Sequence, residues 1–425
     1  MPSLQKLRIA TFVILIGFLT AIFFDAWMTH LGYPYPANSF LFNPANRFMD
    51  FFNTYHFTRA FDYQSSALAV YFPLAYWVFA PFALIPADAS FFLYNIVFCS
   101  YIYFYMMLYT KTVKEQIGSS LAYHHLLMGI IFLSYPILYC LDRGNLENLL
   151  FIFTSVSLLF FIHRKYTASA IFLSIAIGMK LYPMVFLLLF LKERRYKELT
   201  ICVMLTILLS LLSLALLHGG FVENWRILMS RIMPASKEGM LDGSVMAGIR
   251  QTASLFGMFK VMILVVLAKT HHVVDMNLFL RHLDKFSHQY RVISMAALLM
   301  LSGYLLKFER VFWKQTMILV LIIILFPAIS FNYKFIYLFI PFAAFLCQEP
   351  KQSIYDKIYL ALFLVLLIPK NYYVFPVALV NYPSAFDPND LIVSISVFID
   401  PIVMVTFLIL IMIERLTGKE NQKIA

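Results

Sequence analysis

The sequence predicts an all-α polytopic membrane protein. Its 425 residues are 62% hydrophobic and only 13% charged, and the apolar runs are too long and too many for one soluble core. Most basic residues lie in short stretches between those runs, where membrane orientation and anionic headgroups explain the net charge of +11. We therefore expect membrane lipids as partners and no nucleic acid.

The first apolar run covers residues 8 to 28 and predicts a retained first helix. It follows Lys6 and Arg8 and has no small-residue cleavage site, so the N-terminus is expected in the cytoplasm. The polar and aromatic stretch 29–66 is then extracytoplasmic. The run 71–86 contains three prolines and is too short between them for a span, which predicts an interfacial or re-entrant helix.

The middle of the chain predicts three spans and a hairpin. The spans are expected at about 90–110, 121–139 and 147–163. The next apolar run, 167–191, has basic clusters at both ends. A single span would place one cluster outside, whereas a hairpin of two short helices breaking at Lys180-Leu-Tyr-Pro183 keeps both inside.

The C-terminal half begins with a span at about 198–218 and a mixed segment, 219–290. The apolar run within that segment, 261–268, is shorter than the roughly 20 residues that a span needs and is expected to be interfacial. Counting the hairpin as two, we expect about twelve spans with both termini in the cytoplasm. The later helices are expected at about 291–306, 313–330, 335–348, 355–370 and 391–414.

The chain is expected to form one transmembrane domain over residues 1–425. Within it, residues 1–218 are the expected catalytic module, and residues 219–425 supply an external segment and the C-terminal helices. Compact stretches between the helices favour a bacterial cytoplasmic membrane.

Lys180 is the most unusual residue of the chain. An ionisable side chain at membrane depth costs about 3 kcal/mol on insertion scales, so it usually faces a wet cavity or a charged partner. The natural partner of a lysine is an anion. The motif Asp142-Arg-Gly-Asn145 is expected on the same outer side, with Asn145 capping the helix that follows. Capping leaves Arg143 unexplained, and its forked guanidinium suits phosphate or sugar oxygens.

Asp50 lies among aromatic residues in the first external stretch. There it can act as a general base toward a sugar hydroxyl. The alternative is a solvated carboxylate paired with Arg47 or Arg59. Asp25 and Asp62 are competing candidates for the base.

Other polar groups are less specific. Lys334, in Asn332-Tyr-Lys334, is a candidate second phosphate contact, although the three residues could equally sit at the headgroups. The aromatic strip that begins at Tyr71 favours interfacial anchoring or a groove for a lipid tail. The histidines do not show the spacing that zinc sites favour, and no glycine-rich nucleotide loop is present. We expect neither a metal nor a soluble nucleotide.

Taken in order, these motifs resemble the GT-C superfamily of membrane glycosyltransferases, and glycosyltransferase family 87 above all. The resemblance rests on an aspartate in the first loop, Tyr71-Phe-Pro, Arg143-Gly-Asn145, Lys180-Leu-Tyr-Pro183 and the basic residues at 192–197. It is best over about residues 45–200. That family contains polyprenol-phosphate-mannose-dependent alpha-mannosyltransferases.

The resemblance implies a GT-C-like helix bundle with amphipathic helices in its first external loop. It also implies that Asp50 is the catalytic aspartate and that Lys180 lies near the donor phosphate. Many GT-C enzymes carry two acidic residues in the first loop, whereas Asp50 has Phe48 and Phe52 at the two-residue spacing. Some relatives place a histidine where this chain has Asn332-Tyr-Lys334.

The expected reaction is transfer of a sugar, mannose first, from a polyprenyl-phosphate donor to a lipid or glycan acceptor, with inversion and without a cofactor. Lys180, with Arg143 or Lys334, would stabilise the phosphate charge, and Asp50 would deprotonate the acceptor. A transporter or flippase of a lipid-linked sugar or anion, and a GT-C enzyme for another sugar, remain alternatives. The expected pocket residues are Tyr71, Asn145, Tyr182, Asn332 and Tyr333.

Overall fold

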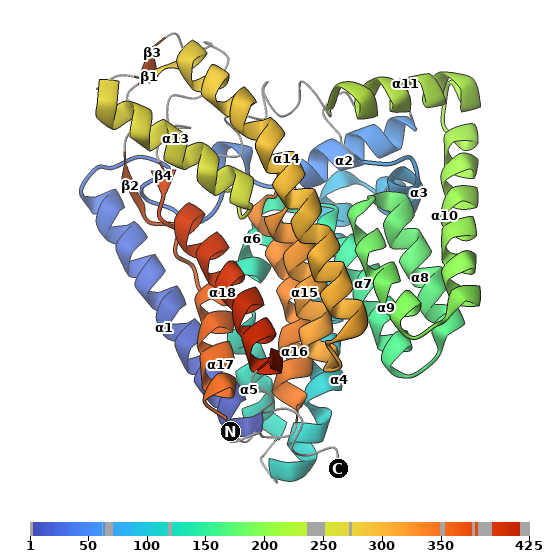
Figure 1. The fold of residues 1–425 in the computed structure, drawn as a ribbon, viewed down its shortest axis with the longest axis horizontal. Helices are drawn as coiled ribbons and strands as arrows, with labels where there is room; N and C mark the ends of the chain where they lie inside the picture. Colours follow the sequence, from blue (N-terminus) through green and yellow to red (C-terminus); the bar gives the residue numbers. More distant parts are fainter. Residues whose placement is uncertain are drawn as a thin grey trace. The chain divides into compact units, whose positions relative to one another are not determined.

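A computed structural model describes residues 3–61, 63, 71–117, 121–235, 251–271, 274–348, 353–375, 379–380 and 393–416. The described chain is predominantly helical (Figure 1), as predicted. It forms two compact units. The first unit comprises Met1–Ala45, Met106–Tyr139 and Glu238–Ala425, and the second comprises Asn46–Tyr105 and Cys140–Lys237. The expected division at residue 218 stays a prediction.

The second unit is built on three helices that pack side by side (Figure 1): α7 (Glu147–Ile162), α8 (Tyr166–Met179) and α10 (Tyr196–Leu216). Between α8 and α10 lie a 3-10 helix, η2 (Tyr182–Phe186), and the short α9 (Leu187–Lys192). The predicted break at Lys180 is confirmed, because α8 ends at Met179 and Lys180 has an extended backbone (φ −160°, ψ 137°).

Two tight turns of the same design reverse the chain in this unit. Arg164 and Arg194 adopt left-handed conformations, with φ of 58° and 54°. In each turn, the amide of the following residue bonds to the carbonyl oxygen five residues earlier, at 2.9 and 2.8 Å, which satisfies the end of the preceding helix. Arg164, Lys165 and Arg195 line one shared pocket, so the two basic clusters lie at the same end of the hairpin.

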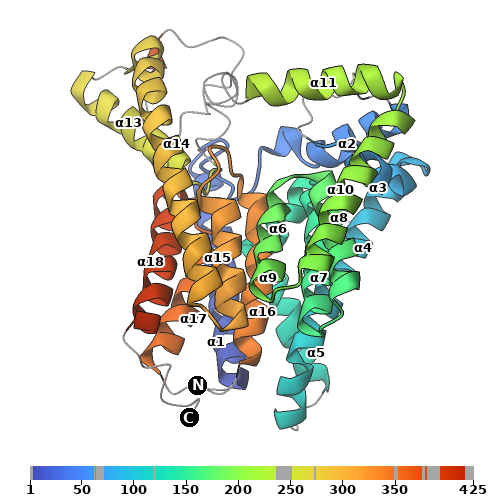
Figure 2. The ribbon, with the colours of Figure 1, turned by 45° about the vertical axis from the view of Figure 1, so that its right-hand side comes forward.

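Shorter helices complete the second unit. Helix α2 (Met49–Ala60) packs on α3 (Leu74–Ala83), which packs on α8. Helix α4 (Ala87–Ile117) begins in this unit and ends in the first. Helix α11 (Gly220–Ala235) lies across one end of α10 (Figures 1 and 2). The buried residues Tyr63, Tyr76, Leu214, Leu217 and Leu228 form the small core there.

The first unit surrounds α15 (Phe312–Leu325), in which every residue from Trp313 to Leu325 is buried. From Met317 to Leu325 this helix is apolar on all sides, and such a helix belongs in the interior of a bundle. Its neighbours include α14, α16 and α18. The other helices of the unit are α1 (Ser3–His30), α5 (Leu121–Ile131), α13 (Leu255–His271), α14 (Met276–Lys307), η3 (Asn332–Leu338), α16 (Phe339–Cys347), α17 (Ile354–Leu367) and α18 (Ser396–Leu416).

The mixed segment 219–290 contains more helix than the sequence indicates. Helix α14 begins fifteen residues before the expected span, and its first half packs on α13 through Phe279, Leu283 and Tyr290. Charged residues separate these three in the sequence, so a search for continuous apolar runs does not detect this amphipathic part of the helix. Small strand pairs lie nearby: β1 (Val274–Asp275) pairs in parallel with β3 (Leu379–Val380), and β2 (Tyr373–Phe375) antiparallel with β4 (Val393–Ser394).

The span expected at 121–139 is wrong as one continuous helix. Helix α5 ends at Ile131, and α6 (Tyr135–Arg143) begins after three residues of turn. Pro136 has no N–H with which to continue the helix. Five described helices are long and apolar enough to cross a membrane, namely α1, α10, α18 and most of α4 and α14. The count of twelve spans stays a prediction.

Candidate active site

Asp50 lies in the first turn of α2, which the end of α6 holds in place. The N–H of Phe48 donates to the carbonyl oxygen of Asp142 at 2.9 Å, and the fully buried Phe51 packs against Gly144. Gly144 has a φ of +58°, and a Cβ built on it would lie 2.7 Å from the Cβ of Phe51. The chain therefore makes a tight turn at Gly144, and only glycine fits where the two segments meet.

The Asp50 carboxylate is held by residues on both sides of that glycine. Arg143 Nε lies 3.1 Å from Oδ2, and its Nη2 donates to Oδ1. Asn145 Nδ2 donates to Oδ2 at 2.6 Å. The Asp50 side chain is 19% exposed and that of Arg143 is 8% exposed. A two-point contact from a guanidinium fixes the direction of a carboxylate as well as its charge.

The alternative pairing of Asp50 with Arg47 or Arg59 is wrong. Arg47 Nε lies 3.2 Å from Asp142 Oδ1 instead, and Arg59 Nη1 donates to the hydroxyl of Tyr55 at 3.2 Å. The sequence spacing favoured near neighbours of Asp50, whereas the α2–α6 contact brings in an arginine more than ninety residues away.

The competing aspartates have different settings. Asp25 belongs to α1 in the first unit, where its Oδ2 accepts the N–H of Phe40 at 3.2 Å. Asp62 lies outside the described residues.

Asn145 connects the Asp50 carboxylate to two further groups. Its Oδ1 accepts the N–H of Glu147 at 3.0 Å, which confirms the predicted helix cap, and it also accepts the hydroxyl of Tyr71 at 3.2 Å. Burial raises the pKa of Tyr71 well above its ordinary value, and the nearby charges of Asp50 and Glu147 raise it further. The Tyr71 hydroxyl therefore stays protonated at neutral pH and serves as the donor in its bond to Asn145.

Lys180 contacts an anion that belongs to the protein itself. Its Nζ lies 2.5 Å from Glu147 Oε1, and the hydroxyl of Tyr182 donates to Oε2 of the same carboxylate. Glu147 is fully buried, whereas the Lys180 side chain is 17% exposed. The ammonium also lies 5.3 Å from the centre of the Tyr71 ring. The negative charge of the buried Glu147 carboxylate is thus balanced by the Lys180 ammonium, and the Tyr182 hydroxyl adds a hydrogen bond to it.

Glu147 is the site residue that the sequence analysis missed. It lies in the first turn of α7, where acidic residues are common because they favour the helix dipole. The signal that could have found it is the one used for Lys180: an ionisable side chain bordering a long apolar run, which requires a partner.

An apolar groove of about 510 Å³ lies on the same unit. Its walls come from α3, α7, α8 and α10, and the lining includes Trp77, Ile175 and Leu209. Helix α3 starts three residues after Tyr71, and Leu74, its first residue and part of this lining, packs closely against Gly178, two residues before Lys180. The groove therefore begins beside the polar cluster.

The remaining candidates lie in the first unit. Asn332 Nδ2 donates to the hydroxyl of Tyr135 at 2.8 Å, and the Lys334 ammonium donates to the carbonyl oxygen of Ile323 at 3.2 Å. Both side chains are buried, at 0% and 5% exposed, while the Tyr333 ring packs beside Phe331. The structure thus brings Asp50, Tyr71, Arg143, Asn145, Lys180 and Tyr182 together in one unit and these three in the other.

Comparison with known families decides the class of the protein. The model of glycosyltransferase family 87 matches residues 69–302, more than half of the chain. The chain belongs to glycosyltransferase family 87. No curated protein matches it. The matched range of this family 87 glycosyltransferase contains Tyr71, Arg143, Glu147 and Lys180, while Asp50 precedes it.

The family and the apolar helices together define a membrane-bound glycosyltransferase. An enzyme of this class acts on a sugar donor and an acceptor. Within the described residues, the Asp50–Lys180 cluster brings two carboxylates and two cations together.

Proposed function

We propose that this family 87 enzyme transfers a sugar, with mannose the first candidate, from a polyprenyl-phosphate donor to a lipid or glycan acceptor with inversion. The observation that carries the proposal is the continuous cluster of Asp50, Arg143, Asn145, Tyr71, Lys180 and Glu147. It combines a directed carboxylate with two cations, and an apolar groove begins beside it.

The cations would receive the donor phosphate. Arg143 and Lys180 each hold one carboxylate in the structure. An incoming phosphate would compete for both, replacing carboxylate contacts with contacts to an oxyanion whose charge grows as the sugar leaves. Asn145 and Tyr71 would supply hydrogen bonds between the two cations.

Asp50 would act as the general base. When Arg143 turns toward the phosphate, the carboxylate oxygens of Asp50 become available to the acceptor hydroxyl, while Asn145 keeps the group oriented. Asp50 would remove the proton of the acceptor hydroxyl as its oxygen attacks the anomeric carbon. Because the oxygen attacks from the face opposite the leaving phosphate, the configuration at that carbon is inverted. No cofactor enters this step.

The groove along α3, α7, α8 and α10 would hold the isoprenoid chain of the donor. Its lining is apolar. Leu74, which is part of that lining, packs against Gly178, two residues before Lys180, so a phosphate at the cluster would leave the chain directed into the groove. Lys334, Asn332 and Tyr333 remain proposed as further contacts to the donor or acceptor.

The proposed orientation places the site on the extracytoplasmic face of a bacterial cytoplasmic membrane and both termini in the cytoplasm. In the first unit, α1 begins and α18 ends at the same end (Figures 1 and 2), and Lys6 and Arg415 lie near those helix ends. Basic residues at one end of a bundle favour the cytoplasmic side.

The test is sugar transfer by purified enzyme with a panel of polyprenyl-phosphate sugars. Asp50→Asn is expected to lower the transfer rate by about a hundredfold or more, as expected for loss of a general base. Asp88→Asn, which alters an exposed aspartate in the first turn of α4, is the matched control and should keep the wild-type rate. Transfer by Asp50→Asn at the wild-type rate would disprove the assigned base.

A further inference from the structure

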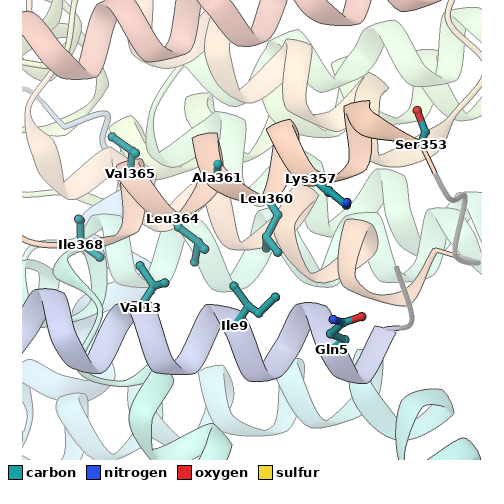
Figure 3. Close-up of a pocket in the computed structure, with 10 residues that line it drawn as sticks. All are labelled: Gln5, Ile9, Val13, Ser353, Lys357, Leu360, Ala361, Leu364, Val365 and Ile368. Atoms are coloured by element: carbon teal, nitrogen blue, oxygen red, sulfur yellow. The ribbon is translucent and has the colours of Figure 1, made fainter.

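A second groove lies in the first unit, away from every residue assigned above. It measures about 920 Å³ and runs between α1 and α17 (Figure 3). Gln5, Ile9 and Val13 follow one another at intervals of four residues along α1, so they form one stripe of that helix. Figure 3 shows this stripe facing a second one on α17 that includes Leu360 and Leu364.

The two ends of the groove differ in chemistry. Gln5, Ser353 and Lys357 lie near one another at one end, whereas the lining toward Ile368 is apolar (Figure 3). A Cβ on Gly17 would lie 2.7 Å from Ile368, so the two helices meet at the apolar end and close it. From Lys357 to Ile368 is eleven residues, or about 16 Å of helix, close to half of the roughly 30 Å hydrocarbon core.

The charge at the open end is positive. Lys357 is exposed, while the neighbouring Asp356 faces the interior, where its Oδ2 lies 3.1 Å from Lys6 Nζ with both side chains nearly buried. The described lining holds no acidic side chain. The groove thus presents a cation, an amide and a hydroxyl above an apolar channel one leaflet deep.

We propose that this groove binds one phospholipid with an anionic headgroup, such as phosphatidylglycerol, from the leaflet that contacts the N-terminus of α1. The phosphate lies at Lys357 with Gln5 and Ser353 as hydrogen-bonding neighbours, and an acyl chain lies along Leu360 and Leu364 toward Ile368. The site is separate from sugar transfer and would stabilise the α1–α17 pair.

The test is lipid binding to the full chain in detergent, followed by native mass spectrometry during titration with phosphatidylglycerol. We expect one lipid to bind more tightly than the rest, and phosphatidylcholine to bind at least fivefold more weakly. Lys357→Ala should weaken the phosphatidylglycerol site about fivefold, the equivalent of about 1 kcal/mol for one basic residue at a membrane surface. Lys285→Ala, which removes an exposed lysine of α14, is the matched control.

A second variant separates the acyl chain from the headgroup. Ala361 is an exposed residue of the groove lining, so Ala361→Trp fills the groove without forcing a larger side chain into the core. This variant should lose tight binding of phosphatidylglycerol although Lys357 is intact. Soluble glycerophosphoglycerol should not compete at equal concentration, because it lacks the chain.

Three results would overturn the proposal. The first is equal affinity for phosphatidylglycerol and phosphatidylcholine. The second is an equal loss of affinity for phosphatidylglycerol in Lys357→Ala and Lys285→Ala. The third is a wild-type dimer that Ala361→Trp dissociates with no change in lipid binding. None of these depends on sugar transfer, so the proposed function stands or fails separately.

Discussion

Gly144 sets the geometry of the candidate active site at the scale of one residue. It has a positive φ, and its Cα faces the Cβ of Phe51. Gly144→Ala should lower the free energy of unfolding by about 1–3 kcal/mol, because it combines a left-handed backbone with a collision. The change in melting temperature in detergent measures this, and the transfer rate should fall with it, since Arg143 and Asn145 flank the turn.

Gly129→Ala is the matched control for that substitution. Gly129 lies inside α5, and no heavy atom lies within 4 Å of a Cβ built there. Alanine should be neutral or stabilise the helix by about 0.5–1 kcal/mol. If both variants melted alike, the assigned role of Gly144 would be wrong.

Glu147 and Lys180 are predicted to act as one unit. Glu147→Gln leaves the partly buried Lys180 without its counter-charge and should cost about 3 kcal/mol. The double variant Glu147→Gln/Lys180→Met should be more stable than Glu147→Gln alone but still inactive, because the phosphate contact is gone. A double-mutant cycle on thermal stability should give a coupling above about 1 kcal/mol.

The exposed pair Glu223–Arg226 on α11, at 2.9 Å, provides the comparison for that cycle. Both side chains are open to solvent, so the coupling there should be below about 0.5 kcal/mol. A Glu147–Lys180 coupling no larger than this would contradict the charge-balanced pair.

The sequence predicted most of the cluster but not its internal pairing. Lys180 and Arg143 were singled out because local structure could not explain a cation there. Their partners, Glu147 and Asp50, could not be assigned from spacing, because those contacts depend on how α2, α6 and α8 pack. Asn145 was predicted as a helix cap, and its contact with Asp50 depends on the same packing.

At the scale of an element, the groove lined by α3, α7, α8 and α10 is predicted to select donors by chain length. Ile175→Trp should narrow it and raise the KM for a long-chain polyprenyl donor about tenfold, the equivalent of one or two lost methylene contacts. The KM for a short-chain analogue of two isoprene units should not change. Steady-state kinetics with both donors measures the difference.

Ile207→Trp introduces the same bulk on α10 at a residue that is 49% exposed and outside the described groove lining. It should leave both KM values at the wild-type level. An equal rise for short and long donors in Ile175→Trp would instead indicate a general distortion of the second unit.

Helix α13 carries a predicted pH dependence. Burial lowers the pKa of Lys260 from its ordinary value to about 7, while in the unfolded chain it stays near 10.4. Between these two pKa values Lys260 is protonated in the unfolded chain but neutral in the folded one, so the free energy of unfolding should rise as the pH increases from about 7 to about 10. Below pH 7 Lys260 is protonated in both states and contributes no pH dependence. Melting temperatures of wild type and Lys260→Met across that range test it. Parallel curves would contradict the assignment.

Helix positions were predictable where apolar runs are long and uninterrupted, as in α1, α7 and α10. The prediction of helix positions failed where one helix changes from an amphipathic to a fully apolar sequence, or where a proline interrupts an apolar run. Helix α14 is amphipathic at its start and apolar later, and only the later part was found. The break between α5 and α6 depends on Pro136, which a count of apolar residues overlooks.

At the scale of the whole molecule, the predicted topology can be tested by labelling single cysteines. In a background without Cys99, Cys140, Cys202 and Cys347, a cysteine at Tyr33 should react with an impermeant thiol reagent added to intact cells. A cysteine at Lys165 should react only after permeabilisation. Both positions are exposed, so accessibility reports the side of the membrane. Labelling of the Lys165 position in intact cells would reverse the proposed orientation.

The internal charge balance of the candidate site has a consequence for selectivity. With Arg143 and Lys180 already facing carboxylates, the cluster has little net positive charge with which to concentrate soluble anions. Inorganic phosphate and nucleotides, which are abundant in and around cells, would have to displace two carboxylates without any compensating gain. A lipid phosphate compensates for that displacement because its chain is buried in the apolar groove. The enzyme would therefore discriminate against water-soluble anions because Arg143 and Lys180 are already paired with carboxylates, and no segment would have to close over the site.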